Sequence, residues 1–283
     1  MNQKSRARVI SFGCQKGGVS KSTISAIIAW LLARAGKKVL LIDCDSQGNG
    51  SYLLHRQNIY DFFGSTTLEA ILDRGFKPRV VEISENLHVV PAEDSLSDIE
   101  QWIYVGWRDS YPEAYENGRH LALLREALYD VRAEYDFIFL DLPPSPGLLT
   151  QMGLVASDYA TVVMACDMLC YEAVFRYIGI LKSVQSDFNP SLRLLGIVPS
   201  LIDSRAGLDE GFLAKAREEY QDFIFDTVLR RNIKIKEFAA TGISDKYVSE
   251  RRALVPYEKL LEEMIIRVGK FEAGKSSIVS GAI

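Results

Sequence analysis

Apolar residues gather along the chain in short runs, most of which end at a carboxylate, a glycine or a proline. The runs fall at residues 8–12, 39–42, 87–90, 137–140, 160–165, 194–198 and 223–228. Runs of this length, apolar at nearly every position, are typical of strands that are buried on both faces of a parallel sheet. The pattern therefore predicts a strand at each of these seven places.

Between the strands, apolar residues recur at the spacing of a helix. Residues 22–35 form such a stretch and end at Gly36, and similar stretches cover 121–131 and 248–268. Thr66 and Glu69 are spaced as a capping box at the start of another helix. Alternating strands and helices predict a single open, mostly parallel α/β domain over residues 1–272. We expect an insertion or surface loop rich in aromatic residues over 102–118, and a disordered tail over 273–283.

Composition narrows the class of protein without identifying it. The chain has 283 residues, 48% of them apolar, with 33 Lys and Arg against 37 Asp and Glu. These values exclude a disordered chain, a collagen-like chain and a disulfide scaffold. The near balance of charge means that any contact with nucleic acid must come from a local patch or from two copies together. No apolar run reaches the ~18 residues that span a bilayer, so we expect a soluble, cytoplasmic protein.

The strongest candidate for chemistry is the Gly-rich stretch between the first strand and the first helix. Such a loop turns backbone N–H groups toward phosphate oxygens, and the following helix N-terminus favours negative charge. We expect Lys21 to reach the β- and γ-phosphates of ATP and the Ser22 hydroxyl to bind Mg²⁺. The predicted nucleotide-binding residues of this loop are Lys16, Gly17, Gly18, Val19, Ser20, Lys21, Ser22 and Thr23.

Three carboxylates follow predicted strands directly. Asp43 and Asp45 come after the strand at 39–42, and Asp141 comes after the strand at 137–140. Ligands of open parallel sheets gather at the carboxyl ends of strands, so these side chains should converge near the loop. We expect Asp141 to order Mg²⁺ and Asp45 to orient the attacking water. Asp43 would support Mg²⁺ or Lys21, giving a metal site of Ser22, Asp43 and Asp141.

The loop departs from the usual phosphate-binding pattern G-x-x-x-x-G-K-(S/T), because Gln15 and Ser20 replace its glycines. It instead resembles the deviant Walker A motif K-G-G-x-x-K-(S/T) of the ParA/MinD group of ATPases. The stretches VLLIDCDSQGN (39–49) and YDFIFLDLPPSPGLL (135–149) are also similar to that group. LLGIVPSLIDSR (194–205) and LRRN (229–232) match two later landmarks. Over residues 8–268 the chain resembles a ParA-type partition ATPase.

The resemblance implies a switch operated by ATP. ATP would hold two subunits in a sandwich homodimer, with Lys16 reaching the partner's phosphates and acting in catalysis beside Lys21 and Asp45. The dimer would bind DNA without sequence preference. A ParB-like adaptor would stimulate slow hydrolysis and so move plasmid, chromosome or other cargo. The protein would then be nucleoid-associated and independent of membranes.

The same resemblance suggests which residues meet DNA and the adenine base. It places DNA contacts at Arg205 and Lys234, and the local basic run adds Arg230 and Lys236. Asn232 aligns with the loop that contacts the adenine edge, so part of this run could face nucleotide instead. Two copies in a dimer would double the phosphate contacts and could make binding conditional on ATP.

Three other readings stay open at this stage. The first is a switch that binds nucleotide but barely hydrolyses it, and Ser20 suggests it because this residue stands where Gly is usual. A side chain there costs ~1 kcal/mol if the position needs a positive φ. A MinD-like membrane ATPase would need a basic amphipathic C-terminal helix, whose apolar face could use Met264, Ile265, Ile266, Val268 and Phe271. An ATP-dependent ligase or an iron–sulfur reductase would use the same fold. The cluster version needs paired cysteines, whereas Cys14, Cys44, Cys166 and Cys170 form no CxxC pair.

Overall fold

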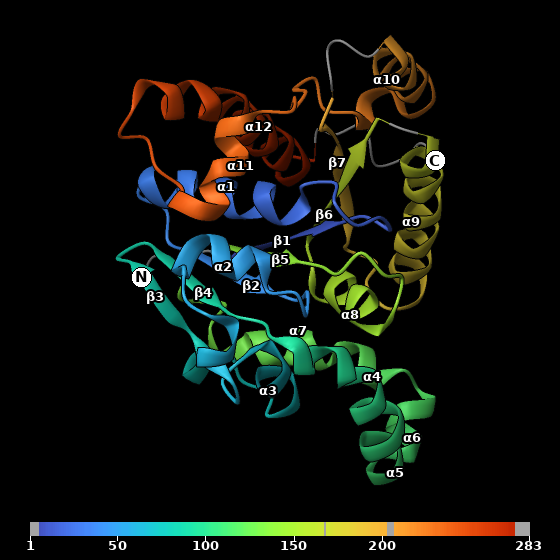
Figure 1. Cartoon of the computed structure of the whole chain (residues 1–283). Coiled ribbons are helices and arrows are strands. Elements are labelled where there is room, and N and C mark those ends of the chain that lie inside the picture. The colour runs from blue at the N-terminus through green and yellow to red at the C-terminus, as the bar shows by residue number, and fades with distance from the viewer. Residues whose placement is uncertain (1–5, 167, 203–206, 275–283) are drawn as a thin grey trace.

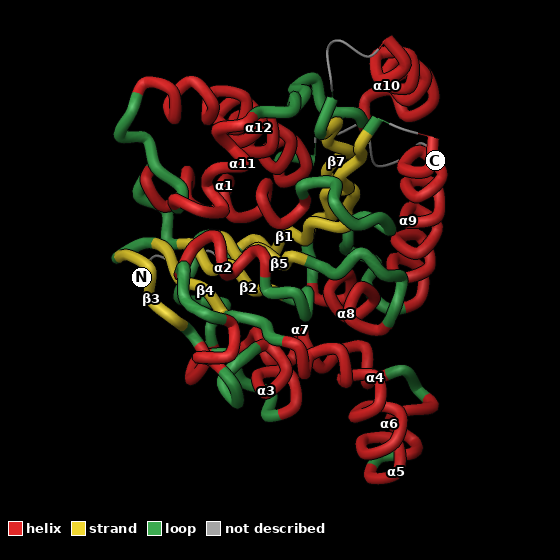
Figure 2. Tube along the Cα trace, in the orientation of Figure 1, coloured by secondary structure: helices red, strands yellow, loops and turns green. Residues whose placement is uncertain are grey.

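The computed structural model describes residues 6–166, 168–202 and 207–274, which form an α/β fold around one seven-stranded sheet (Figures 1 and 2). The strand order is β3-β4-β2-β5-β1-β6-β7. All neighbours are parallel except β3 and β4, which are antiparallel. The bounds are β1 Arg8–Gly13, β2 Val39–Asp43, β3 Val81–Ser84, β4 Leu87–Val90, β5 Phe137–Asp141, β6 Tyr159–Ala165 and β7 Arg193–Ser200.

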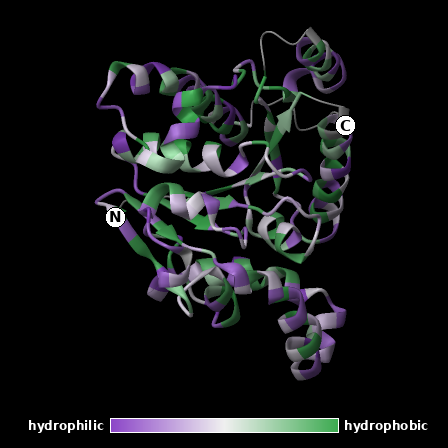
Figure 3. Cartoon of the chain, in the orientation of Figure 1, coloured by the Kyte–Doolittle hydropathy of each residue, from purple (hydrophilic) through white to green (hydrophobic). Residues whose placement is uncertain are grey.

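Helices cover both faces of the sheet. In Figure 1, α1 and α12 lie above it and α7 and α8 lie below it. Figure 3 shows mostly hydrophobic strands between helices in which hydrophilic and hydrophobic residues alternate. The helices are α1 Lys21–Arg34, α2 Asn49–His55, α3 Thr67–Leu72, α4 Ile99–Gln101, α5 Arg108–Ser110, α6 Pro112–Glu116, α7 Leu123–Ala127, α8 Leu148–Ala156, α9 Met168–Asp187, α10 Gly207–Tyr220, α11 Ile233–Thr241 and α12 Val248–Glu272.

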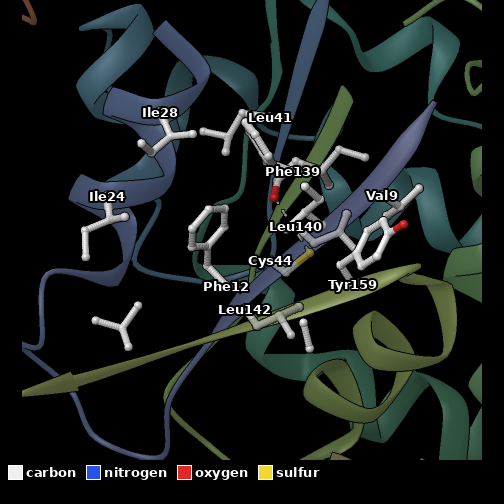
Figure 4. Close-up of a cluster of buried hydrophobic side chains, with 14 of the residues drawn as sticks. Val9, Phe12, Ile24, Ile28, Leu41, Cys44, Phe139, Leu140, Leu142 and Tyr159 are labelled. Carbon is white, nitrogen blue, oxygen red and sulfur yellow. Dashed lines mark hydrogen bonds between the residues drawn. The ribbon is translucent and has the colours of Figure 1, made fainter. Parts of the chain in front are cut away.

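The core holds α1 firmly against the centre of the sheet (Figure 4). Ile24 and Ile28 face inward from α1 and are completely buried. The rings of Phe12 on β1 and Phe139 on β5 pack edge to face at 5.5 Å. Because α1 is fixed over these strands, the loop between β1 and α1 has a defined position at the carboxyl edge of the sheet.

Most of the predicted elements are confirmed, but the strand expected at 223–228 is wrong. Within that segment one isolated bridge joins Ile224 to Ile197 of β7, and the Phe225 N–H donates to the Ile197 carbonyl at 2.9 Å. Instead of a further ladder, the buried Arg267 guanidinium donates to the carbonyls of Leu195 and Ile224. At Leu195, a side chain thus takes the place of backbone pairing on this edge of the sheet.

Three further differences concern β3, the aromatic insertion and the helix expected at 121–131. The sequence analysis missed β3, whose residues alternate between half-buried and exposed and so give no continuous apolar run. The expected loop at 102–118 is largely helical, with a π-helical segment η4 (Trp102–Trp107) between α4 and α5. The helix expected at 121–131 is divided into α7 and two short 3-10 turns. Residues 275–283 of the predicted tail lie outside the described residues.

Candidate nucleotide site

The loop that joins β1 to α1 contains two residues in the left-handed region. Gly18 has φ +75° and Ser20 has φ +70°, and Ser20 directly precedes α1. The Ser20 carbonyl accepts the first helical hydrogen bond from Ile24 N at 2.9 Å. The position therefore needs the conformation that glycine adopts freely, and Ser20 adopts it at a cost of about 1 kcal/mol.

Lys21 begins α1 and turns its side chain into the base of the site. Its Nζ lies 3.1 Å from Oδ1 of Asp141 and 3.8 Å from Oδ2 of Asp45, and only 6% of the side chain is exposed. Burial opposes the charged form of Lys21, but the attraction of Asp141 and Asp45 outweighs it and raises the lysine pKa. Lys21 is therefore a buried, permanently charged group at the place where phosphates would arrive.

Asp43 and Asp141 lie side by side at the ends of β2 and β5 and are both fully buried. Asp43 accepts hydrogen bonds from the Ser51 N–H at 2.7 Å and the Ser51 hydroxyl at 2.9 Å. Burial and the neighbouring Asp141 together raise the pKa of Asp43 to about 7. Burial also raises the pKa of Asp141, against the opposing influence of Lys21.

Gly50 lets both carboxylates lie against the backbone of α2. A Cβ at this position would lie 2.6 Å from Oδ2 of Asp141 and 3.2 Å from Oδ2 of Asp43. The sequence analysis identified neither Gly50 nor Ser51 as a site residue. The available signal was their place a few residues after Asp45, in the first turn of α2, where small residues gather.

The residues present fit a hard divalent cation such as Mg²⁺. Oδ2 of Asp141 is buried and has no hydrogen-bond partner among the described residues. Ser22 follows Lys21 on the first turn of α1 and its hydroxyl hydrogen-bonds the Asp141 carboxylate. No group of three or more His, Cys, Asp or Glu side chains within the described ranges forms a closed metal cage. An incomplete oxygen set leaves positions for phosphate oxygens and water, which is how Mg²⁺ is usually held.

A cavity of about 340 Å³ opens above these groups. It brings together every loop residue that the sequence analysis predicted, from Lys16 to Thr23, with Asp45 on its wall. Pro144, and Ile235 and Lys236 of α11, also line this cavity.

A second cavity, of about 680 Å³, adjoins the first. The two share Gly18, Ser20, Thr23, Ile235 and Lys236, and Asn232 lines only the second. The Asn232 side chain accepts a hydrogen bond from Lys234 N at 2.9 Å and so caps α11. Asn232 therefore shares a cavity with residues of the phosphate loop and also caps α11, and its contact with the adenine base stays a prediction.

The predicted DNA-binding residues do not form one uncompensated patch. Both terminal nitrogens of Arg230 lie 3.0 Å from Oε1 of Glu210, and Lys234 pairs closely with Glu237. Lys236 lines both cavities. Arg205 falls outside the described residues.

The alternative readings find little structural support. All four cysteines are buried as free thiols, and the described residues contain no cysteine cluster fit for a metal. Met264 and Val268 of α12 are buried in the core, which leaves only Ile265 and Ile266 exposed from the apolar set. None of the helices in the described part of the chain is long and apolar enough to span a bilayer.

Comparison with known proteins gives the class to which this fold and site belong. Residues 7–194 match the family described as AAA domain. The chain is similar to a cobyrinic acid a,c-diamide synthase from Mycobacterium smegmatis solved with ADP and magnesium, with a TM-score of 0.75, 25% identity, and coverage of 95% of this chain and 96% of that one. It has the fold of a plasmid partition protein from Borrelia burgdorferi bound to AMPPNP, with a TM-score of 0.74, 19% identity, and coverage of 93% and 100%.

Sequence relatives narrow this class. The chain is 31% identical over 268 residues to the chromosome-partitioning ATPase Soj of Treponema pallidum, covering 93% of this chain and 99% of that protein. It is 32% identical over 238 residues to the chromosome partitioning protein ParA of Myxococcus xanthus, covering 83% and 79%. The chain belongs to the ParA-type family of partitioning ATPases.

Proposed function

We propose that this protein is a partition ATPase whose ATP-bound homodimer binds DNA without sequence preference. The dimer is released when a ParB-like adaptor stimulates hydrolysis. The observation that carries the proposal is the position of Lys21. It is buried against Asp141 and Asp45 at the base of a cavity that Lys16 also lines.

The chain is an ATPase that works with ATP and Mg²⁺. Bound Mg²⁺ would neutralise charge on the β- and γ-phosphate oxygens. The Ser22 hydroxyl and the Asp43 and Asp141 carboxylates are the groups that would hold it. The glycines of the loop allow its backbone N–H groups to turn toward the phosphates. The Lys21 ammonium group would then exchange its contact with Asp141 for one with the γ-phosphate.

Asp45 is the proposed water-orienting residue. It lines the cavity next to Lys21, and only 8% of the residue is exposed. A carboxylate at this place can accept a proton from a water that attacks the γ-phosphate. Lys16, on the rim of the same cavity, would complete the charge around the phosphates of the partner subunit, so that hydrolysis depends on dimerisation.

DNA would contact the surface that carries Arg230, Lys234 and Lys236, and the contact proposed for Arg205 rests on the sequence alone. In the single subunit, Glu210 and Glu237 satisfy two of these cations. Exposed ion pairs of this kind are worth little, so phosphate groups can compete for both cations when two subunits present them together.

The test is salt-dependent binding to duplex DNA of arbitrary sequence, without nucleotide, with ADP, and with ATP and Mg²⁺. We expect binding only with ATP and Mg²⁺, and we expect Lys16→Ala to abolish it. Lys37→Ala is the matched control, because Lys37 is an exposed lysine beyond the end of α1. Binding that ignores nucleotide, or that survives Lys16→Ala, would contradict the proposal.

A switch that binds nucleotide but barely hydrolyses it is the second candidate, and the strained conformation of Ser20 favours it. Single-turnover hydrolysis separates the two candidates. The switch predicts tight ATP binding and ATP-dependent DNA binding with almost no phosphate release. The partition ATPase predicts slow release that Asp45→Asn removes without loss of ATP binding.

The ligase alternative shares this fold, as the similarity to the diamide synthase illustrates. The sequence relatives at 31–32% identity are partitioning proteins. They therefore favour the partition reading over amide ligation.

A further inference from the structure

Residues 94–119 form a helical arm that projects from the body of the molecule beside α8 (Figure 1). The arm contains α4, η4, α5 and α6. Six of its residues, Trp102–Trp107, are π-helical. π-helical segments are rare and occur frequently at functional sites. The site described above makes no use of the arm's outer surface.

One side of the arm is anchored in the core while the other presents large apolar groups to solvent. Ile99 and Ile103 are buried. Trp102, Val105 and Tyr111 are 54%, 56% and 53% exposed. Apolar residues of this size, gathered on one projection, are typical of a surface that binds a partner.

The aromatic rings behind this surface support one another. The rings of Tyr115 and His120 stack at 4.6 Å, and Trp107 packs against both Tyr111 and His120. Such contacts fix the side chains in place before any partner arrives. The surface is therefore preorganised, which lowers the entropy cost of binding.

Charge identifies the kind of partner. The arm holds six of the 37 acidic residues of the chain and only two of the 33 basic ones, so the rest of the chain is electrically balanced. Asp109, Glu113 and Glu116 lie exposed near Tyr111 in the sequence. An acidic surface repels DNA phosphates and anionic lipids, whereas it attracts lysine and arginine, which also stack on aromatic rings. A basic, amphipathic protein segment matches both the charge and the apolar groups.

The arm also touches the element that follows Asp141. Oε1 of Glu100 accepts a hydrogen bond from Leu148 N, the first residue of α8, at 3.1 Å. A Cβ on Gly147 would lie 2.6 Å from the same oxygen. The loop 142–147 joins Asp141 to α8, and its Pro144 lines the nucleotide cavity. A movement of α4 would therefore shift the end of this loop.

We infer that the arm is the docking surface for a basic, amphipathic segment of a protein partner, and that Glu100 transmits docking to the nucleotide site. Docking stands independently of the activity. Transmission rests on the proposed function, because it needs a nucleotide cycle to control.

Docking can be tested with a fluorescent synthetic helix of Lys, Leu and Ala, about four turns long. Its binding to the full chain is followed by anisotropy at about 0.1 M salt. We expect Glu113→Lys with Glu116→Lys to weaken binding about tenfold, and Trp102→Ala to weaken it by a similar factor. The matched controls are Glu258→Lys with Glu262→Lys on exposed positions of α12, and Phe63→Ala, a substitution of another exposed aromatic residue. These controls should bind the peptide as the wild type does.

Equal weakening by the control reversal would overturn the docking assignment, because the peptide would then respond only to net charge. Equal binding of a Glu, Leu and Ala helix would overturn it as well. The assignment also fails if the arm substitutions change binding to duplex DNA or to vesicles of anionic lipid while leaving peptide binding intact.

Transmission is tested by the effect of the peptide on ATP hydrolysis. In the wild type, we expect saturating peptide to change the hydrolysis rate by about fivefold or more. Glu100→Ala should bind the peptide normally but lose this response, and Glu100→Gln, which keeps an acceptor oxygen, should retain most of it. A full response in Glu100→Ala would contradict transmission. Should the wild type hydrolyse no ATP at all, the proposed function fails while the anisotropy assay still decides docking.

Discussion

Nζ of Lys21 and Oδ1 of Asp141 are 3.1 Å apart at the base of the nucleotide cavity, although 120 positions separate the two residues in the chain. In the absence of nucleotide, the carboxylate therefore satisfies the lysine that would bind phosphate. Any phosphate that enters must compete with Asp141 for this cation. The ion pair keeps the lysine charged and in place. It also weakens the binding of nucleotide phosphate, because the pair must separate first.

Asp141→Asn should reveal this competition. The amide leaves Lys21 free for phosphate and removes one buried negative charge, so nucleotide without Mg²⁺ should bind about tenfold more tightly. Mg²⁺ should no longer strengthen binding, because a carboxylate of its site is lost. Isothermal titration with and without a chelator measures both effects, with the exposed Asp73→Asn as control. Weaker binding of Mg²⁺-free nucleotide would show that Asp141 does not hold Lys21 back.

Ser20→Gly should stabilise the free protein by about 1 kcal/mol, because glycine adopts the left-handed conformation without strain. Thermal unfolding without nucleotide should show the gain. Ser20→Ala is the matched control, since alanine keeps the strain and should bring no gain. If both substitutions stabilise the protein equally, the serine side chain and not the backbone conformation causes the loss of stability.

Gly50→Ala should damage the site from outside the phosphate loop. The added methyl group would press on both Asp43 and Asp141, so we expect a loss of roughly 1–3 kcal/mol in stability and of Mg²⁺-dependent hydrolysis. Gly211→Ala, in α10 with no atom near its added Cβ, should instead be neutral or stabilising. Chemical denaturation and phosphate release check the pair. Normal Mg²⁺ dependence in Gly50→Ala would mean that the carboxylates can separate at no cost to function.

His55 should make stability depend on pH. Burial lowers its pKa from 6.5 to about 4, despite the opposing effect of Asp61. Between these values the unfolded chain binds a proton that the folded chain does not. The stability contributed by neutral His55 is therefore complete above pH 6.5 and is lost as the pH falls from 6.5 toward 4. Urea unfolding at several pH values should show a flatter dependence for His55→Gln than for the wild type, and parallel curves would count against this role.

Glu237→Gln should strengthen DNA binding if Lys234 contacts phosphate. The substitution releases Lys234 from its ion pair, so the affinity of the ATP-bound protein for duplex DNA should rise. One further phosphate contact would steepen the slope of log affinity against log salt by about 0.9. Glu262→Gln, on the exposed surface of α12, is the charge-matched control. Identical slopes for the two variants would remove Lys234 from the DNA surface.

The parts of the site that follow one another in the chain were predictable from the sequence. The loop from Lys16 to Thr23 lies between a strand and a helix, and its position follows from local pattern alone. Asp43 and Asp141 were predictable for a related reason, because each directly ends a buried strand and parallel strands end at a common edge. The conformational demand at Ser20 was also predictable, since the usual phosphate-binding pattern has glycine there.

Contacts that depend on three-dimensional packing were not predictable in the same way. Nothing in the local pattern shows that Gly50 of α2 must lack a side chain because the carboxylates of Asp43 and Asp141, at the ends of two strands, lie against it. The hydrogen bond from Leu148 N to Glu100 joins residues 48 positions apart. The apolar run at 223–228 fits the pattern of a strand. However, the Arg267 guanidinium binds the carbonyls of Leu195 and Ile224, and the spacing of apolar residues does not predict this contact.

That guanidinium also bears on how the molecule avoids aggregation. β7 is an outermost strand, and such strands readily recruit the backbone of another chain. Here the segment that follows residue 223 and the Arg267 fork occupy carbonyls that a foreign strand would need, including those of Leu195 and Ile197. At the opposite margin, β3 is only four residues long and exposes Glu82. Uncontrolled sheet growth is thereby opposed at both margins, so any recognition between copies of this chain would use loops and helices.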